Sequence, residues 1–304
     1  MTKVFIDGSA GTTGLRIRER LSERKDLELI VLPEELRKDA NARRDALNTA
    51  DVAFLCLPDL AAIEAVAMVE NPHTVVIDTS TAHRVNPDWT YGFPELAGQR
   101  ERIADAKRIA NPGCHASGFI ALVAPLVAKG LLTGATELSA FSLTGYSGGG
   151  KKMIAEYAEK GTTDEFLGGR QYALGQTHKH LPEMVKYCGL SKAPVFSPIV
   201  VPHYSGMEVT VPLHGLDPEA VKSCYREYYG ASGLVHFVDD LDAGGIISSA
   251  KLSGRDDMLI GVYGNAERLI VVSLFDNLGK GASGAAIQNM NISLNVAETT
   301  GLKI

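Results

Sequence analysis

The chain has 304 residues, of which 45% are hydrophobic and 22% are charged, and its formal net charge is −6. This length and composition are typical of an ordinary globular protein with two domains. Charges of both signs are interspersed without a basic stripe, so we expect no nucleic-acid partner.

The N-terminal residues combine a strand, a glycine turn and a helix. An apolar strand pattern over residues 3–7 leads into the turn, and an amphipathic helix pattern follows over residues 15–23. This is the order in which a helix N-terminus binds the pyrophosphate of a dinucleotide. The spacing G-x-x-G-x-x-G differs from the more familiar G-x-G-x-x-G, so a glycine turn without a ligand stays the alternative. The residues that we assign to cofactor binding here are Gly8, Gly11, Thr12, Thr13 and Gly14.

A second strand is predicted over residues 27–32, and a polar segment over residues 33–45 follows it. In a dinucleotide site this segment lies beside the adenosine ribose, where an acidic side chain suits NAD and a basic one suits NADP. Glu34 and Arg37 represent the two possibilities, and the residues alone leave the choice open. We take Arg37 as a cofactor contact, with a solvated surface as the alternative.

Strands are predicted over residues 50–57 and 74–78, with a helix over residues 60–69 between them. Strands that alternate with helices form a doubly wound parallel sheet, so the first domain is predicted to be an α/β domain of the Rossmann type. Ligands collect in the loops at the carboxyl ends of such strands. Arg84, in the loop after the last of these strands, is a candidate to hold an anionic substrate group, and an ordinary surface arginine is the alternative.

A cysteine follows the last strand of this half. The strand is predicted over residues 107–110, the turn Asn111-Pro112-Gly113-Cys114 follows it, and an apolar helix pattern covers residues 119–128. A thiol at the start of a helix is stabilised as the thiolate, which is the nucleophilic form. Free cysteine is also among the most buried residue types, so a packed thiol is the alternative. Cys114 is our candidate nucleophile.

The cysteines and the apolar runs indicate where the protein resides. Cys56, Cys114, Cys188 and Cys224 have no paired spacing, which argues for a reducing compartment and against disulfides or a zinc ribbon. The chain enters a strand pattern at Lys3 without an apolar leader, and no apolar run reaches the ~18 residues of a membrane span. We expect a cytoplasmic protein without a membrane partner.

After the cysteine turn the pattern changes to strands that alternate apolar and polar residues, as in a sheet with one solvent-exposed face. This predicts a second domain of the α+β class with a helix over residues 218–229. The solvent-exposed face of its sheet suits a subunit interface in a homo-oligomer. The predicted domains are residues 1–114, residues 115–280, and residues 281–304 as a helix that returns to the first domain. The strands are predicted over residues 137–143, 194–201, 207–213, 234–238, 258–263 and 268–275.

Three stretches of the second half carry candidate site residues. The glycine-rich loop at Ser147 offers backbone N–H groups to an anion or a nicotinamide edge, with a flexible loop as the alternative. His178 and His180 place two imidazoles within three residues, which suits acid–base catalysis. A structural pair is the alternative, and no metal is expected because further ligands with convincing spacing are missing. Asn277 and Gly279 belong to a turn before the terminal helix that is predicted to close the cofactor cleft.

Together these motifs resemble the short form of the N-acetyl-γ-glutamyl-phosphate reductase family, which is related to aspartate-semialdehyde and glyceraldehyde-3-phosphate dehydrogenases. The resemblance covers nearly the whole chain. It implies NADP as the cofactor, an acyl phosphate as the substrate and a second domain of the glyceraldehyde-3-phosphate dehydrogenase-like type. The motifs that carry it are GSAGTTG from Gly8, NPGC from Asn111, HKHLPE from His178 and GKGASG from Gly279.

By position, the resemblance implies that Cys114 is the nucleophile. It implies an acid–base and a substrate-phosphate contact on His178 and His180 without saying which residue does which. His115 matches no acid–base position of the family, so we leave it outside the catalytic set. The sequence departs from the longer family form at Lys179, which replaces an arginine, and in its glycine loop. The residues assigned to substrate binding are Arg84, Tyr172 and Ser147.

The expected activity is reduction of N-acetyl-γ-glutamyl phosphate by NADPH through a thioester on Cys114, in arginine biosynthesis, by a homo-oligomer that is a dimer or tetramer. Three alternatives stay open. The first is an aspartate-semialdehyde dehydrogenase, and the second is a cysteine hydrolase or transferase without hydride transfer. The third is a non-catalytic dinucleotide-binding protein in which Cys114 is only packed.

Overall fold

The computed structural model describes residues 1–304, which form two units. The first unit contains Met1–Pro112 and Ala282–Leu302, and the second contains Gly113–Gly281 with Lys303–Ile304. The chain therefore leaves the first unit immediately before the glycine that precedes the candidate nucleophile.

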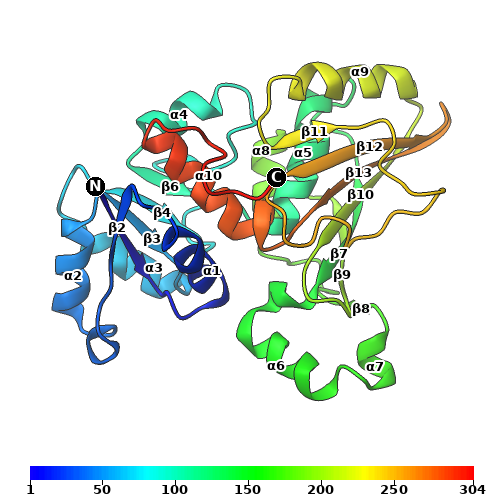
Figure 1. The fold of residues 1–304 in the computed structure, drawn as a ribbon. Helices are drawn as coiled ribbons and strands as arrows, with labels where there is room; N and C mark the ends of the chain where they lie inside the picture. The colour runs from blue at the N-terminus through cyan, green and yellow to red at the C-terminus, as the bar shows by residue number, and fades with distance from the viewer. The chain divides into compact units, whose positions relative to one another are not determined.

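The first unit contains sheet A, whose strands are β1 (Thr2–Asp7), β2 (Leu27–Ile30), β3 (Val52–Leu55), β4 (Val75–Asp78), β5 (Thr90–Tyr91) and β6 (Arg108–Ala110). All pair in parallel, in the order β2-β1-β3-β4-β6-β5 (Figure 1). The strand order reverses between β1 and β3, and doubly wound sheets bind ligands at the carboxyl ends of the strands at such a point. The predicted Rossmann-type sheet is confirmed.

Helices cover both faces of sheet A because apolar side chains project from both faces. Ile17 of α1 (Thr12–Leu21), Ile103 of α4 (Gln99–Asp105) and Ile287 of α10 (Gly284–Ser293) belong to the buried cluster on one face. Leu47 of α2 (Ala40–Thr49) and Ala65 of α3 (Asp59–Ala67) belong to the cluster on the other face. The C-terminal helix α10 thus packs within the first unit, beside α4 in Figure 1. A single 3-10 turn, η1 (Glu34–Leu36), follows β2.

Close backbone contacts define the glycine turn between β1 and α1. Gly8 has a φ of +85°, and a Cβ atom there would lie 2.3 Å from the carbonyl oxygen of Cys56. A Cβ atom on Gly14 would lie 2.6 Å from the carbonyl oxygen of Gly8. The N–H of Gly11 closes the turn with a 3.0 Å hydrogen bond to that same oxygen, and α1 begins at Thr12, earlier than predicted. Only glycine fits at Gly8 and Gly14.

The second unit contains sheet B, whose strands are β7 (Ser139–Gly145), β8 (Arg170–Gln171), β9 (Val195–Val201), β10 (Met207–His214), β11 (Val235–Phe237), β12 (Met258–Gly264) and β13 (Arg268–Phe275). Their order is β11-β12-β13-β10-β7-β9-β8. The sheet is mixed, because β7 pairs in parallel with β9 and β11 with β12, whereas the other pairs are antiparallel. The predicted α+β second domain is confirmed, and β8 is a short strand that the sequence pattern did not indicate.

Two helices, α5 (Cys114–Ala128) and α9 (Pro218–Tyr229), pack on one face of sheet B, and α8 (Leu181–Cys188) packs against α5. The approach of α5 to the sheet is closest at Gly118. A Cβ atom there would lie 2.5 Å from Cγ2 of Val209 on β10 and 2.8 Å from Cε1 of Phe275 on β13. The glycine therefore lets the apolar helix lie directly on the two strands.

The other face of sheet B is only partly covered. At one end, Leu241 and Leu252 pack with Val272 of β13 in a buried cluster. Toward β7 and β9 the face stays open, where the side chains of Phe141 and Val195 are 49% and 63% exposed. Strand register places these side chains on the same face as Val272. Apolar side chains are therefore exposed on the open part of this face.

The segment between β7 and β8 contains η2 (Tyr146–Gly149), α6 (Gly150–Lys160) and α7 (Asp164–Leu167). Tyr157 and Phe166 pack with Val200 of β9 in a small buried cluster. The guanidinium of Arg170 lies 4.0 Å from the centroid of the Phe166 ring, a cation–π contact. This packing ties the segment to sheet B just before the chain reaches Tyr172.

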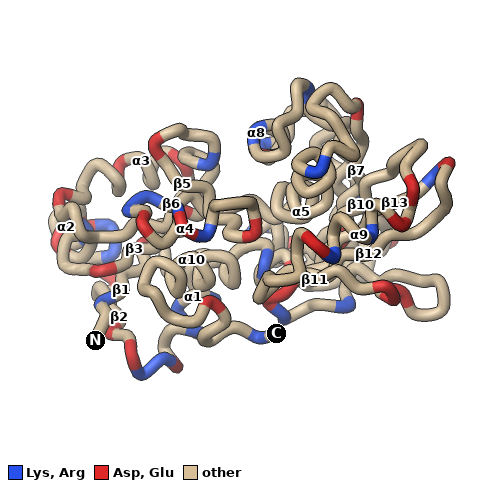
Figure 2. The backbone as a smooth tube through the Cα atoms, turned by 90° about the horizontal axis from the view of Figure 1, so that it is seen from above, with Lys and Arg blue, Asp and Glu red and all other residues tan.

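Charged residues of both signs are distributed along the backbone of both units, and Figure 2 shows no continuous stripe of lysine and arginine positions. Helix α5 contains no charged residue. No helix combines the length and the apolar character that crossing a bilayer would require.

Helix α5 contains Pro125, which has no N–H group and leaves the carbonyl oxygen of Ala121 without its helical partner. The phenol of Tyr229 on α9 donates a 2.7 Å hydrogen bond to this oxygen. The phenol of Tyr225 donates a 2.6 Å bond to the next carbonyl, that of Leu122. Helix α9 thus replaces the hydrogen bond that the proline removes.

We expect Tyr229→Phe to lower the free energy of unfolding by about 1–3 kcal/mol, because the buried Ala121 carbonyl would lose its hydrogen bond. The loss should shrink in a Pro125→Ala background, where the helix regains an N–H donor for the same oxygen. Urea unfolding of the two single variants and the double variant measures this coupling. Equal losses in both backgrounds would contradict the role of Tyr229.

Candidate active site

Cys114 is the first residue of α5, and its neighbours define the start of that helix. Gly113 is the N-cap, and its carbonyl oxygen accepts a 2.8 Å hydrogen bond from the N–H of Ser117. The N–H of Gly113 donates a 2.9 Å bond to Oε2 of the buried Glu183. A Cβ atom on Gly281 would lie 2.9 Å from Cβ of Cys114, so the Gly281 backbone packs on the cysteine. The thiol lies at the N-terminus of this helix, as predicted, where a thiolate is favoured.

The other three cysteines are poor nucleophiles. Burial raises the pKa of the Cys56 thiol to about 12, and burial also raises the pKa of Cys188 well above its ordinary value. The pKa of Cys224 is raised by burial too, and its thiol donates a 3.5 Å bond to the carbonyl of Pro125. Cys188 and Cys224 are buried, whereas Cys114 is partly exposed. Because a thiol must ionise before it attacks, these surroundings favour Cys114 as the nucleophile.

Aromatic and imidazole rings gather beside the start of α5. The ring centroid of His115 lies 5.2 Å from that of His178 and 5.5 Å from that of His180. The rings of His178 and His180 are 4.7 Å apart, and the Tyr172 ring lies 5.7 Å from His178. Phe196 packs edge-on against His115 and His178, at 5.3 Å from each. The structure therefore brings Tyr172, His178 and His180 together within the second unit.

The loop that carries Tyr172 is held on β9. The N–H of Tyr172 donates a 3.1 Å hydrogen bond to the carbonyl of Pro198. The side-chain amide of Gln176 pairs with the backbone of Phe196 through hydrogen bonds of 2.9 and 2.8 Å. Ala173 and Gln176 have φ values of +52° and +55°, a conformation that non-glycine residues keep only where the surroundings hold them. The backbone therefore gives the Tyr172 phenol a defined place.

His178 and His180 lie just before α8. The N–H of His180 donates a 3.1 Å hydrogen bond to Nδ1 of His178, so a neutral His178 carries its hydrogen on Nε2. His180 occupies the N-cap of α8, and Glu183 in the first turn anchors this helix to the start of α5. His180 is buried and His178 is half-buried. No three His, Cys, Asp or Glu side chains are grouped as ligands for a metal ion.

His115 lies at the centre of the ring cluster, although it matches no acid–base position of the family and was expected outside the catalytic set. Its Nδ1 lies 2.7 Å from Oγ of Ser142, and its Nε2 lies 2.6 Å from the phenol oxygen of Tyr172. The residue is 2% exposed. The sequence does carry a signal, because His115 is the only imidazole in an otherwise uncharged helix, and a buried imidazole needs polar partners.

His115 should make folding stability depend on pH. Burial, followed by the charges of His178 and Lys179, holds the pKa of His115 well below its ordinary value of 6.5. The unfolded chain binds a proton at this imidazole below about pH 6.5, whereas the folded protein does not. The free energy of unfolding should therefore fall as the pH drops below about 6.5, by up to about 1.4 kcal/mol per pH unit from this group.

Urea unfolding of the His115→Gln variant at a series of pH values measures how much His115 contributes to the pH dependence of the free energy of unfolding. The variant should show a shallower loss of stability toward acid pH than the wild type. The exposed His214 provides the matched control, and His214→Gln should keep the wild-type slope. An unchanged slope in His115→Gln would mean that the imidazole is protonated in the folded state.

Ser147 and Asn277 are joined to each other within the second unit. Nδ2 of Asn277 donates a 3.0 Å hydrogen bond to Oγ of Ser147, and Oδ1 of Asn277 accepts a 2.9 Å bond from the N–H of Gly206. Both side chains are buried. Gly279 lies so close to Arg255 that a Cβ atom would be 1.9 Å from the Arg255 carbonyl oxygen. These contacts give all three predicted residues a structural role, and their roles toward ligands stay predictions.

Arg84 belongs to the first unit and follows β4. Asp78, the last residue of β4, lies 2.7 Å from Nδ1 of His83. Nη2 of Arg84 donates a 2.9 Å hydrogen bond to the carbonyl of Thr79, and the residue is 7% exposed. Its predicted contact with the substrate stays a prediction.

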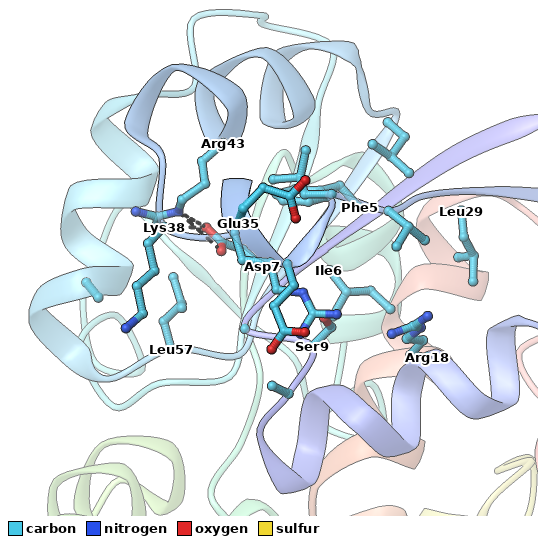
Figure 3. A pocket seen from close by; sticks show the side chains of 18 residues that line it. Phe5, Ile6, Asp7, Ser9, Arg18, Leu29, Glu35, Lys38, Arg43 and Leu57 are labelled. Atoms are coloured by element: carbon cyan, nitrogen blue, oxygen red, sulfur yellow. Dashed lines mark hydrogen bonds and ion pairs between the residues drawn. The ribbon is translucent and has the colours of Figure 1, made fainter.

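A cavity of about 690 Å³ opens beside the glycine turn in the first unit (Figure 3). Within it, the guanidinium of Arg43 donates to both carboxylate oxygens of Asp7, with Nη2 at 2.8 Å from Oδ2. This ion pair neutralises the carboxylate at the end of β1. Arg37 and Lys38 also line the cavity, and neither side chain has an ion pair or hydrogen bond in the structure.

The cavity and the adjoining helix start fit a dinucleotide. Gly8 and Arg37 line the cavity. The hydroxyl of Thr12 is buried without a hydrogen-bond partner, so it has a donor to offer a phosphate oxygen. The first turn of α1 contains no acidic residue, which suits an anion at this helix N-terminus. Four other residues that were predicted to contact the cofactor do not line this cavity. They form the end of the glycine turn and the start of α1, and they are Gly11, Thr12, Thr13 and Gly14.

Two family models match the chain. The semialdehyde dehydrogenase NAD binding domain matches residues 3–106, and the semialdehyde dehydrogenase dimerisation domain matches residues 114–277. Among the curated relatives, the proteins named N-acetyl-gamma-glutamyl-phosphate reductase from Brucella ovis and Brucella melitensis are each 46% identical over 305 residues. These alignments cover 96% of this chain and 98% of each relative.

Solved structures confirm the fold. The aspartate semialdehyde dehydrogenase II of Vibrio cholerae complexed with ASA has a TM-score of 0.74 at 18% identity, over 97% of this chain and 98% of that chain. The aspartate semialdehyde dehydrogenase of Candida albicans with NADP has a TM-score of 0.67 at 17% identity, over 97% and 99%. The curated relatives are far more similar to this chain in sequence than these solved structures are. The chain belongs to the N-acetyl-gamma-glutamyl-phosphate reductase family, within the semialdehyde dehydrogenases.

Proposed function

We propose that the chain catalyses the NADPH-dependent reduction of N-acetyl-γ-glutamyl phosphate to N-acetylglutamate 5-semialdehyde and phosphate, in arginine biosynthesis. The observation that carries the proposal is the thiol of Cys114 at the start of α5, with His178 and His180 beside the adjacent His115. A nucleophile at a helix N-terminus together with an acid–base group is what acyl transfer to a thiol needs. The family supports the identity of the acyl group.

The proposed reaction begins when the Cys114 thiolate attacks the acyl carbon. A carbon–sulfur bond forms, the bond from that carbon to the phosphate oxygen breaks, and phosphate leaves with the electron pair. The backbone N–H groups of His115 and Ala116 have no acceptor in the structure, so they are suited to hold the developing oxyanion. NADPH, when bound, supplies the hydride that reduces the thioester. The carbon–sulfur bond then breaks, which releases the semialdehyde and returns the electron pair to the Cys114 sulfur.

The two histidines are proposed to have different roles in the reaction. His178 is half-buried and, when neutral, carries its hydrogen on Nε2, so it is the proposed acid–base for the substrate oxygen. His180 is then the proposed contact for the substrate phosphate. This assignment rests on the hydrogen bond from the His180 N–H to Nδ1 of His178.

The cavity beside the glycine turn is the proposed site for the adenosine part of NADPH. Arg37 and Lys38 are two cations without partners there, and a 2′-phosphate is the group that needs them. Asp7 is neutralised by Arg43, so its charge does not oppose the phosphate.

We expect the double variant Arg37→Ala, Lys38→Ala to raise KM for NADPH by about ten- to a hundredfold, because charge-assisted hydrogen bonds to the 2′-phosphate would be lost. KM for NADH, which lacks that phosphate, should change little. Steady-state kinetics with both cofactors measures the difference. Lys25→Ala is the matched control, because Lys25 is exposed and does not line the cavity. Parallel changes for NADPH and NADH would refute the 2′-phosphate contact.

The reverse reaction tests the whole proposal. Purified protein is mixed with inorganic phosphate and NADP, and formation of NADPH is followed by absorbance with N-acetylglutamate 5-semialdehyde or with aspartate semialdehyde. We expect the acetylated semialdehyde to be preferred in kcat/KM. A preference for aspartate semialdehyde would move the activity to the dehydrogenase of that substrate.

A second arm of this assay separates reduction from simple acyl transfer. N-acetyl-γ-glutamyl phosphate is supplied with and without NADPH, and release of phosphate is measured over many turnovers. We expect sustained release only with NADPH, since a thioester that is not reduced blocks Cys114. Sustained release without NADPH would indicate a cysteine hydrolase, and no reaction in either arm would leave only a binding protein.

We propose that the open apolar part of sheet B, with Phe141 and Val195 on its surface, is the interface of a homodimer. The match of residues 114–277 to a dimerisation domain supports this assignment. We also propose a cytoplasmic location, where thiols stay reduced and Cys114 remains available.

A further inference from the structure

Arg170 on β8 differs from the other arginines of the second unit. This unit contains four arginines, and three of them form an ion pair with a carboxylate. The guanidinium of Arg170 has no hydrogen bond or ion pair, although the residue is half-buried. Donors that lose water without gaining an acceptor are costly, so this group is suited to an anion from outside the chain. The three paired arginines are Arg226, Arg255 and Arg268.

Aromatic rings of the segment between β7 and β8 hold the guanidinium in place. Its Cζ lies 4.0 Å from the ring centroid of Phe166 and 5.7 Å from that of Tyr157. The Tyr157 ring packs edge-on against Phe166 at 5.0 Å and stacks on Tyr146 at 4.4 Å. A guanidinium that stacks on a ring is fixed through its face, so the N–H groups at its edges stay available to an acceptor.

The nitrogens of this guanidinium differ in their access to solvent. Nη1 of Arg170 is shielded from solvent and has no partner, and the same is true of the phenol oxygen of Tyr157. Nε and Nη2 of Arg170 also have no partner, but they are not shielded. These two nitrogens form one edge of the planar group, and such an edge binds two oxygens of one carboxylate or phosphate.

The strand places Arg170 next to the candidate active site. It lies two residues before Tyr172, and both side chains face the same side of sheet B, because alternate residues of a strand do. The Tyr172 ring packs against the cluster that contains Phe166. Its phenol oxygen lies 2.6 Å from Nε2 of His115, the residue after Cys114. Arg170 is therefore the next side chain along this face from the ring cluster at the start of α5.

The proposed substrate carries one anionic group to which no contact has been assigned. His180 is the proposed contact of its phosphate, whereas its α-carboxylate has none. In an extended glutamyl chain the carboxylate carbon lies about 5 Å from the acyl carbon, which is comparable to the spacing of about 6.6 Å between alternate side chains of a strand. A carboxylate one side chain beyond Tyr172 thus suits an acyl group held near the start of α5.

We propose that Arg170 binds the α-carboxylate of the acyl phosphate through Nε and Nη2, and that it thereby selects substrates that carry this group. Phe166 acts as the platform on which the guanidinium is held. The identity of the substrate in this inference rests on the proposed function.

The test compares two aldehydes in the reverse reaction with phosphate and NADP. N-acetylglutamate 5-semialdehyde carries the α-carboxylate, and 4-acetamidobutanal is the same molecule without it. We expect the wild type to prefer the first by about a hundredfold in kcat/KM, the effect of two charge-assisted hydrogen bonds. Arg170→Met should abolish most of this preference by raising KM for the carboxylate substrate, and kcat/KM for 4-acetamidobutanal should change little.

The ratio of the two kcat/KM values does not depend on how much of a variant is folded, so it remains informative if Arg170→Met is unstable. Arg170→Lys keeps the charge but has no planar fork, and it should recover only part of the preference. Arg226→Met is the matched control, because Arg226 is exposed and also lies over a ring, that of Phe237. It should keep the wild-type ratio. Equal losses with both aldehydes in Arg170→Met, or an unchanged preference, would overturn the proposal.

A binding measurement separates this inference from the proposed function. Calorimetry compares N-acetyl-L-glutamate with 4-acetamidobutanoate, which lacks only the α-carboxylate. The wild type should bind the first more tightly by about a hundredfold, and Arg170→Met should bind the two alike. This difference without any reductase activity would reject the proposed function and keep the carboxylate site. Reductase activity without this difference would reject only the role of Arg170.

Discussion

The Cys114→Ser variant is expected to lose turnover of the acyl phosphate by a factor on the order of 10⁴ or more. A serine hydroxyl at the start of α5 stays protonated near neutral pH, so the helix N-terminus has no anion to stabilise and the thioester cannot form. Binding of NADPH should be unchanged, because the proposed cofactor cavity lies wholly within the first unit. Phosphate release and NADPH fluorescence measure the two properties separately.

The matched control for this variant is Cys224→Ser. Cys224 is buried on α9, and a serine there can keep the hydrogen bond to the carbonyl of Pro125. It should retain activity close to wild type. Near-normal turnover by Cys114→Ser would show that no covalent bond to this residue is needed, and the proposed mechanism would then be wrong.

The second large effect is expected at the histidine pair. His178→Asn should lower kcat by about 10²- to 10⁴-fold, the usual contribution of a positioned acid–base. His180→Asn should act mainly through KM for the acyl phosphate, since its proposed partner is the substrate phosphate. The pH dependence of kcat should lose one ionisation in His178→Asn only.

His214→Asn is the control for these two variants, because His214 is exposed at the end of β10. A loss of kcat in His180→Asn with normal kcat in His178→Asn would reverse the assignment. Full activity in both variants would reject the pair as catalytic and favour a purely structural role.

Local signals made parts of the fold predictable. Helix α9 has the predicted bounds because the Asp217 side chain caps it, accepting from the N–H of Glu219, and a proline opens it. The start of α5 at Cys114 was predicted, although the apolar pattern begins only at Phe119 and Gly118 is a weak helix residue when read alone. Its place in the helix depends on contact with Val209 and Phe275, which belong to strands far away in the sequence. Such packing has no local signature.

The same distinction applies to the site. The candidate nucleophile and the histidine pair were found from short motifs whose order is itself informative. The hydrogen-bond partners of His115 could not be found in this way, because Ser142 and Tyr172 are 27 and 57 residues from it in the chain. The hydrogen bond between Asn277 and Ser147 spans 130 residues. The pairing of strands in sheet B and the packing of α5 on that sheet bring such residues together.

The hydrogen bond between Gly113 and Glu183 has a mechanical consequence. One end of α8 is attached by it to the N–H that precedes Cys114, while the two histidines before α8 lie beside the same helix start. The next donors, the N–H groups of His115 and Ala116, follow directly along the backbone. A displacement of α8 would therefore move the proposed proton-transfer groups and the proposed oxyanion donors together, so the two cannot be adjusted independently.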